Sequence, residues 1–215
     1  MNLLAMDTST SRASVALEFN GVMFLEEALE IREHARVLLS MVKRVLASAK
    51  TELKYLDGIV FGEGPGSFTG LRIACSVAKG LAYAHDLPMY PVGSLRAIAA
   101  EASHTHTKTH VLAMMDARMN QVYWQLDPES SDVAPCVSAA EDVCVPVNIA
   151  LRLVGADYEP YLDLLQPAIR AAIVSTCEIF PRADAMIRVV KAGGIPSVKA
   201  RAAMPTYVRQ NVTGG

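Results

Sequence analysis

A glycine-rich stretch, GIVFGEGPGSFTGLRIA at residues 58–74, has the composition of a loop that could hold a phosphate group. The dinucleotide pattern G-x-G-x-x-G would need glycine where Ser67 stands, and the P-loop pattern needs a lysine that this stretch lacks. What remains is a helix capped by Ser67 or Thr69, whose free N–H groups could bind an anion. The alternative is a tight strand-to-helix turn that binds nothing, and the pattern leaves both open.

Two aspartates could provide acid–base chemistry, because each ends an apolar run and precedes a polar turn. Asp7 lies in MDTSTSRASVAL (6–17) and Asp116 in MDARMNQVYWQL (115–126). Carboxylates facing each other across a cleft could share proton transfer. The interpretation we favour is that each caps its own turn through an Asx hydrogen bond. A vestigial or shared nucleotide site stays open, and its weak candidates are Asp7, Thr8, Gly64, Gly66, Ser67 and Asp116.

The histidines and cysteines do not form a pattern typical of a metal or nucleophile site. His104, His106 and His110 lie in or beside the polar stretch THTKTH (105–110), whereas a metal needs ligands held rigidly by supporting contacts. Cys75 stands in the middle of a helical pattern among small apolar residues, which is typical of a buried structural thiol rather than of a nucleophile. We therefore predict no catalytic residue and no metal site.

Strand and helix patterns alternate along the chain. In the first half we expect strands at 3–6, 14–19, 22–30, 59–62 and 89–92, and helices at 32–50, 67–85 and 93–103. In the second half we expect strands at 111–115, 151–155 and 169–175, and helices near 139–150, 158–166 and 181–193.

The second half begins as the first does, with a strand, Met-Asp, a polar turn and another strand. We interpret this as an internal duplication. It predicts an α/β fold of two lobes with a cleft between them. We place a first βββαβαβα lobe at 1–104, and a second, smaller α/β lobe with the C-terminal tail at 105–215.

Composition narrows the classes of protein. The net charge of −2 gives no basic field for nucleic acid. The longest near-apolar run, 70–84, is too short to span a bilayer and carries Arg72 and Lys79, so we expect no membrane partner. The four cysteines include no C-x-x-C pair, and the N-terminus lacks the basic flank of a signal peptide. These features favour a cytoplasmic location.

The two long helices carry more apolar surface than a surface helix needs. The helix at 32–50 has an apolar arc of roughly 200°, against somewhat above 100° for an ordinary surface helix. The helix at 67–85 has a large flank (Ile73, Val77, Leu81) and a small flank (Ala74, Ala78, Ala82). We expect the large flank to pack on the chain's own sheet and the small flank to receive another helix. The alternative is that both helices are enclosed within this fold.

Five motifs together resemble the TsaB (YeaZ) family: MDTST, REHARVLLSMV, GEGPGSFTGLRIA, MDARMNQVYW and PTYVRQNV. The resemblance is close over residues 1–124 and thin between about 130 and 200. It implies the two-lobed fold of actin, Hsp70 and sugar kinases with a reduced second lobe. It also implies a part in making threonylcarbamoyladenosine at position 37 of tRNAs that read ANN codons. Such proteins were formerly grouped with M22 glycopeptidases.

The same resemblance implies a non-catalytic subunit. The related subunit TsaD, which transfers the threonylcarbamoyl group, carries a metal-binding His-x-x-x-His after the strand that follows its second long helix. The corresponding stretch here, PVGSLRAIAAE (91–101), has Ser94 and Ile98 at those positions, and isoleucine cannot bind a metal. The alternative is a stand-alone enzyme of the superfamily, either an ATP-dependent small-molecule kinase or an M22-type metallopeptidase.

The resemblance also implies partners. We expect a heterodimer with TsaD, an association with the ATPase TsaE, a homodimer when the chain is alone, and tRNA contact only through the complex. We expect no cofactor of the chain's own, although ATP or ADP could bind in the assembled complex. The predicted interface residues are Val37, Met41, Val45, Leu71, Ala74, Cys75, Ala78 and Ala82.

The low charge generates a first prediction, that the isolated chain binds tRNA poorly. Neutralised phosphates supply most non-specific affinity, which typically gives Kd values of about 10⁻⁴–10⁻⁶ M. A gel shift with unmodified tRNA at roughly physiological salt should show no binding tighter than about 1 μM. Submicromolar binding by the chain alone would contradict the prediction.

Overall fold

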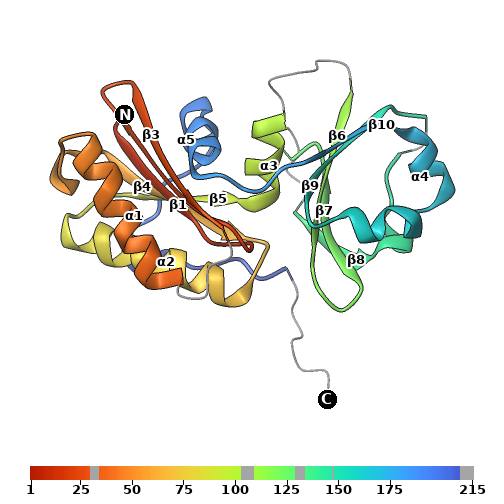
Figure 1. Ribbon diagram of the computed structural model, residues 1–215, viewed down its shortest axis with the longest axis horizontal. Coiled ribbons are helices and arrows are strands. Elements are labelled where there is room, and N and C mark those ends of the chain that lie inside the picture. Colours follow the sequence, from red (N-terminus) through yellow and green to blue (C-terminus); the bar gives the residue numbers. More distant parts are fainter. Residues whose placement is uncertain (30–33, 103–108, 129–133, 147, 209–215) are drawn as a thin grey trace.

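The computed structural model describes residues 1–29, 34–102, 109–128, 134–146 and 148–208. Its described residues form two five-stranded sheets, one in each lobe, with helices on the outside of the first sheet and between the two sheets (Figure 1). None of the helices in these ranges is long and apolar enough to cross a membrane.

The first sheet has the strand order β3-β2-β1-β4-β5. The hairpin strands β1, β2 and β3 pair antiparallel, whereas β4 and β5 run parallel to β1. Strand β1 is central and buried along its whole length, as expected for an apolar strand covered on both faces. The strands are β1 (Leu3–Asp7), β2 (Ala13–Phe19), β3 (Val22–Ala28), β4 (Gly58–Gly64) and β5 (Met89–Gly93).

The second sheet repeats this topology. Its order is β10-β9-β6-β7-β8, with β6 central, β7 and β8 antiparallel, and β9 and β10 parallel. Since β6 is the counterpart of β1, the predicted internal duplication is confirmed at the level of topology. The strands are β6 (His110–Asp116), β7 (Gln121–Leu126), β8 (Cys136–Ala139), β9 (Leu151–Ala156) and β10 (Ile173–Glu178).

Helices surround the two sheets unequally. The long helices α1 (His34–Ser48) and α2 (Phe68–Ala84) cover the outer face of the first sheet (Figure 1). The second sheet has only α4 (Pro167–Ala172) and short 3₁₀ turns at Ala140–Asp142 and Glu159–Leu164. The second lobe is therefore reduced, as expected. Further 3₁₀ turns lie at Leu53–Tyr55 and Ala200–Ala202.

Three elements expected in the second half are wrong in type. The helix expected near 139–150 is the 3₁₀ turn Ala140–Asp142, since Pro146 interrupts any helix there. The helix expected near 158–166 is also a 3₁₀ turn. The strand expected at 169–175 is divided between α4, which has Pro167 in its first turn, and the beginning of β10.

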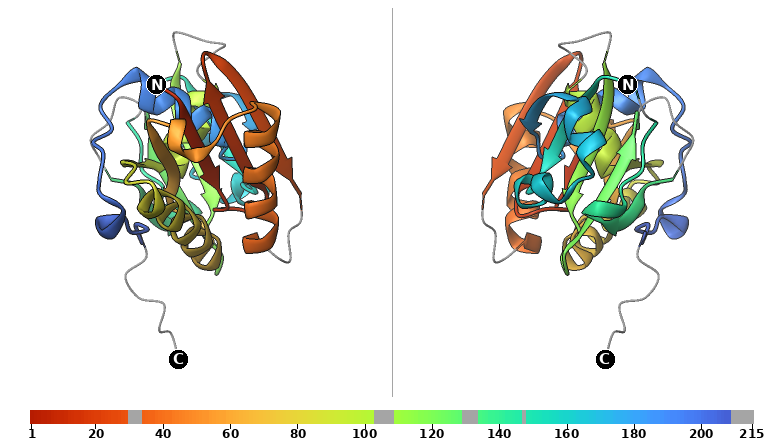
Figure 2. Two further views of the ribbon diagram at one scale, coloured as in Figure 1. Left: turned by 90° about the vertical axis from the view of Figure 1, so that its left-hand side faces the viewer. Right: turned by 90° about the vertical axis from the view of Figure 1, so that its right-hand side faces the viewer.

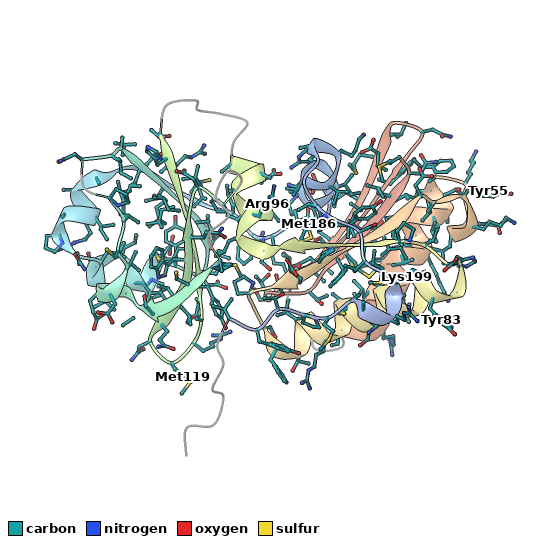
Figure 3. The ribbon with its side chains drawn as sticks, turned by 180° about the vertical axis from the view of Figure 1, so that it is seen from behind. Tyr55, Tyr83, Arg96, Met119, Met186 and Lys199 are labelled. Carbon is teal, nitrogen blue, oxygen red and sulfur yellow. The ribbon has the colours of Figure 1, made fainter. Side chains whose placement is uncertain are left out.

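The division at residue 104 needs correction, because each lobe contributes a helix to the other. Helix α3 (Ser94–Ala102) packs through Leu95 and Ile98 on the second sheet. Helix α5 (Ala183–Ala192) follows the second sheet in the chain, yet Met186 and Ile187 pack on the inner face of the first. Figure 3 labels Met186 on α5 and Arg96 on α3, near the middle of the molecule.

The tail after α5 also returns to the first lobe. Val198 forms an isolated antiparallel bridge with Met89 at the edge of the first sheet, and Ala203 is buried in the core beneath α2. The described residues from α5 onward, 183–208, therefore belong structurally to the first lobe, and a second lobe of 105–215 is too long.

The small flank of α2 faces inward, contrary to expectation. Ala74, Ala78 and Ala82 are fully buried against the first sheet and α1. Ile73, Val77 and Leu81 are only partly buried. Small side chains let a helix lie close to a sheet and to a neighbouring helix. The alanines of α2 therefore face the first sheet and α1, where there is least room.

Most of the predicted interface residues are consequently core residues. Met41, Val45, Leu71 and Cys75 are also buried, and Val37 alone among the eight is partly exposed. These seven buried side chains cannot meet a partner without unfolding, so that part of the prediction is wrong. The outer flank of α2, with Leu39 of α1, remains the exposed apolar surface of the helix pair.

The second prediction follows from this burial. Ala78→Arg should destabilise the fold itself by several kcal/mol, because it inserts a charge and a long side chain into a closed core. Tyr83→Arg is the matched control, since Tyr83 is 82% exposed on the same helix and should change stability by at most about 0.5 kcal/mol. Thermal unfolding followed by circular dichroism measures both. A folded Ala78→Arg variant of unchanged Tm would contradict the burial.

Candidate functional site: the cleft between the lobes

A cleft of about 490 Å³ lies between the two lobes. Three segments of the first lobe meet there with the ends of two strands of the second. They are the turn after β1 (9–11), the loop before α2 (65–69) and the tail (206–208), opposite residues 115–118, Tyr123 and 156–157. Both sheets place the carboxyl ends of their central strands here, which is where α/β sheets bind ligands.

Asp7 ends β1 beneath the floor of the cleft and is fully buried. Its Oδ1 accepts hydrogen bonds from the Ser9 amide at 3.0 Å and the Ser9 hydroxyl at 2.8 Å. Its Oδ2 is buried without a hydrogen-bond partner among the described residues. Burial raises the pKa of Asp7 to about 6, an effect that the two bonds from Ser9 only partly oppose.

Asp116 occupies the equivalent end of β6 and does line the cleft. Its Oδ1 accepts from the Arg118 amide and from the Tyr161 hydroxyl, each at 2.7 Å, and its Oδ2 lies 3.2 Å from the Arg118 guanidinium. The hydrogen bond to Asp116 and burial raise the pKa of Tyr161 to about 12, so Tyr161 stays a donor.

Both aspartates therefore cap their own turns, and the Asx interpretation is confirmed. They do not form an acid–base pair facing one space, because Asp7 lies under the floor and Asp116 is already bonded to an arginine and a tyrosine.

The glycine loop packs directly on the turn after β1. The Ser67 amide donates to the Ser9 carbonyl at 2.7 Å, and the Thr8 hydroxyl donates to the Gly70 carbonyl at 2.6 Å. A Cβ at Gly70 would lie 1.8 Å from the Thr8 carbonyl oxygen, and one at Gly66, whose φ is +157°, would lie 2.4 Å from that of Ser9. These glycines allow two backbones to touch.

Ser67 caps α2, as predicted, by accepting from the Gly70 amide at 3.3 Å. The first amides of α2 have no intrahelical partner and lie at the cleft, so an anion could bind there. The described charged residues of the lining are Asp116, Asp157 and Arg118, without a lysine. The one cation among these described residues, Arg118, is already paired with Asp116.

The structure divides the six candidate residues into two groups. Gly66, Ser67 and Asp116 line the cleft, whereas Asp7, Thr8 and Gly64 lie behind its wall. The sequence alone did not identify Arg118 and Tyr207 as cleft residues, although Arg118 lies in the motif MDARMNQVYW and Tyr207 in the motif PTYVRQNV. Their contact with the cleft depends on the turn after β6 and on the return of the tail.

The candidate metal positions do not converge. Ser94 and Ile98 are both fully buried on α3. His104 and His106 lie outside the described residues, and His110 Nδ1 is paired with an Asp127 carboxylate oxygen at 2.6 Å. Within the described ranges, no group of three or more His, Cys, Asp or Glu side chains could hold a metal ion.

A second, shallower hollow of about 350 Å³ lies on the outer flank of α2, and Phe68 and Thr69 line both it and the cleft. The Arg72 guanidinium lies 3.8 Å over the Phe68 ring, and Arg72 Nε donates to the Tyr207 hydroxyl at 3.0 Å. The residues of this hollow are Phe68, Thr69, Arg72, Ile73, Ser76 and Val77.

Two sheets of one topology around a cleft, with helices exchanged between the lobes, define the two-lobed α/β class of actin, Hsp70 and the sugar kinases. Residues 8–176 match the family model described as TsaD, tRNA N6-adenosine threonylcarbamoyltransferase. Two structures from Pseudomonas aeruginosa superpose closely. One, described as similar to peptidase YeaZ, has a TM-score of 0.84 and 32% identity, covering 97% of this chain and 99% of its own. The other, YeaZ, has a TM-score of 0.82 and 32% identity, covering 96% and 99%.

Two relatives in sequence carry the same name. The tRNA threonylcarbamoyladenosine biosynthesis protein TsaB of Escherichia coli is 43% identical over 99% of this chain and 96% of its own length. The protein of that name from Haemophilus influenzae is 43% identical over 58% of this chain, which spans 52% of the relative. The chain belongs to the TsaB family.

The third prediction concerns pH. Because the folded pKa of Asp7 is about 6 and its ordinary value is 3.8, the folded state holds a proton that the unfolded state releases first. The free energy of unfolding should therefore fall as pH rises from about 4 to about 6, by at most about 3 kcal/mol from this group, and then level off. Asp7→Asn should remove most of this slope, leaving a part due to Glu63, whose pKa burial also raises. Denaturant titrations between pH 4 and 7 measure it. Parallel curves for the variant and the parent protein would refute the assignment.

Proposed function

We propose that this chain is a non-catalytic partner subunit in threonylcarbamoylation of adenosine 37 in tRNAs that read ANN codons, acting with TsaD and TsaE. Two observations together support this proposal most directly. The chain is similar to TsaB over its full length, and Ser94 and Ile98 are buried on α3 at the positions where the catalytic relative would place metal ligands. In this proposal the chain stabilises the active form of TsaD.

The chemistry of the cleft supports a non-catalytic role. Asp7 is sealed beneath the floor, and Asp116, the carboxylate of the two that lines the cleft, is already bonded to Arg118 and Tyr161. The proposal leaves ATP or ADP to the assembled complex, where a partner could add positive charge to a lining whose one described cation, Arg118, is paired with Asp116.

The outer flank of α2 supports a helical contact with a partner. Ile73, Val77 and Leu81 are partly exposed in a row, between Phe68 at 47% and Tyr83 at 82% exposure. We propose that TsaD docks on this flank and that a second copy of the chain occupies it when TsaD is absent. Contact with tRNA arises only in the complex, which fits a cytoplasmic tRNA-modification protein.

The test of the proposed function is reconstitution. The purified chain alone, given ATP, threonylcarbamoyl-adenylate and unmodified tRNA, should form no modified nucleoside, whereas addition of TsaD and TsaE should produce it. Product formed by TsaD and TsaE equally well without the chain would refute the subunit role. Robust transfer by the chain alone would instead favour the stand-alone enzyme.

The fourth prediction locates the interface. Val77→Arg should leave the fold intact, because a long side chain can extend from a partly exposed position to water. It should weaken both self-association and TsaD binding more than about tenfold, since it brings a charge into an apolar helix contact.

Val174→Arg in β10 is the matched control, because Val174 is 62% exposed on the second lobe and should leave binding unchanged. Light scattering gives the mass of the free chain, and a titration with TsaD gives the affinity. A Val77→Arg variant that binds TsaD normally would place the interface elsewhere.

A further inference from the structure

The described part of the tail runs antiparallel along α2 and reaches the mouth of the cleft at residues 206–208. It is anchored first by the Val198–Met89 bridge, by buried Ala203, and by Lys79 Nζ, which donates to the Ala203 carbonyl at 2.9 Å. In Figure 3 the tail passes from Lys199, near Tyr83, toward the side of the molecule where Met119 marks the second lobe. Figure 2 shows the same segment alongside α2. We call residues 204–208, beyond the anchor, the strap.

On its inner side the strap closes part of the cleft. The Thr206 amide donates to the Glu63 carbonyl at 2.7 Å, and its hydroxyl bonds Glu63 Oε2 at 3.0 Å. Gly64 receives the strap, because a Cβ there would lie 2.7 Å from the Thr206 carbonyl oxygen. Thr206, Tyr207 and Val208 are all part of the cleft lining.

On its outer side the strap holds the wall of the α2 hollow. The rings of Tyr207 and Phe68 lie 5.1 Å apart, tilted by 36°, and the Tyr207 hydroxyl accepts from Arg72. No carboxylate of the described residues lies within 4.0 Å of the Arg72 guanidinium, so Tyr207 and the Phe68 ring are what position this charge.

The strap is held by few contacts and is well exposed. Met204 is 68% exposed and Tyr207 is 40% exposed, whereas Ala203 just before them is only 2% exposed. A segment with little buried surface beside a buried anchor can open at low cost in free energy. The strap thus has the properties of a two-state element that touches both the cleft and the α2 hollow.

We propose that docking of TsaD on the α2 hollow and closure of the strap over the mouth of the cleft are positively coupled through Tyr207, Arg72 and Phe68. This inference rests on the proposed function. A partner packed on the hollow removes water around the Arg72–Tyr207 hydrogen bond, which strengthens that bond. A closed strap in turn fixes the Arg72 side chain before docking, so that less conformational entropy is lost on binding.

The consequence is that assembly controls access to the cleft. In the free chain the strap opens and the cleft exchanges its contents with solvent. In the complex the strap stays closed, and Thr206, Tyr207 and Val208 restrict the mouth. The coupling is reciprocal. If TsaD binding stabilises the closed strap by a given factor, opening the strap weakens TsaD binding by that same factor.

The Thr206 amide is the direct reporter of closure, and this experiment is the fifth prediction. Its hydrogen exchange, measured by NMR in the full chain, should slow on TsaD binding by a factor on the order of ten. Tyr207→Phe removes the hydroxyl that Arg72 binds, so exchange at Thr206 should accelerate and TsaD affinity should fall by factors of that order.

Thr206→Val separates coupling from direct contact, because it removes the hydroxyl bond to Glu63 on the cleft side but keeps the amide and the outer surface. It should also weaken TsaD binding, by a smaller factor. Tyr55→Phe deletes a hydroxyl from another exposed tyrosine, 56% exposed against 40% for Tyr207, which lies outside the strap and the hollow, and should change neither quantity.

Two results would overturn this inference and leave the proposed function intact. One is TsaD binding with unchanged exchange at Thr206. The other is a loss of affinity in Tyr207→Phe that Thr206→Val does not share, which would make Tyr207 a simple contact residue. If TsaD does not bind the chain, or binds Val77→Arg normally, the proposed docking on α2 fails and the coupling fails with it.

Discussion

The exchange of α3 and α5 between the lobes is the constraint on which the rest of the structure depends. Helix α3 contacts both sheets, whereas α5 packs on the first sheet and on α3. Charged groups join the two helices: Glu101 of α3 pairs with Arg182 and Arg188, and both arginines also bond Asp184. The first turn of α5 is held by the first sheet, on which the helix packs, since the Ala183 amide donates to the Ser14 hydroxyl of β2 at 2.9 Å. Removing one partner from a partly buried network of paired charges is costly, so these contacts help to fix the angle between the lobes and the shape of the cleft.

Because the angle between the lobes is fixed, the cleft has a defined shape, which contacts on both sides maintain. Arg12, in the turn after β1, lies 3.7 Å over the Phe180 ring at the far end of β10, which ties the two sides of the cleft together. The glycine loop completes the floor by touching the Ser9 and Thr8 carbonyls. Asp7 and Asp116, the two carboxylates considered for acid–base chemistry, hold the turns that follow β1 and β6.

The outer flank of α2, on the outside of the first lobe, is an apolar surface that the rest of the chain only partly covers. Helices α1 and α2 bury their small and inward-facing residues on the sheet, and the outer flank of α2 keeps its larger ones half exposed. The tail lies along this flank and reaches the cleft, so a single segment contacts both surfaces. A partner on α2 and a ligand in the cleft would therefore act on the same few side chains.

The sequence by itself determined most of the local structure: the strands of the first sheet, β6, β7 and β9 of the second, the long helices, a cap for α2 at Ser67 or Thr69, and the equivalent aspartates at the ends of β1 and β6. These follow from periodicity and turn chemistry, which act over a few residues. Only the tertiary structure decided which flank of α2 is buried, because Ala74–Ala78–Ala82 and Ile73–Val77–Leu81 are both apolar and the choice depends on how closely the sheet and α1 approach. It also decided that α5 and the tail return to the first lobe. That placement results from contacts between residues more than a hundred positions apart, such as Ser14 with Ala183 and Glu63 with Thr206, and no local pattern encodes them.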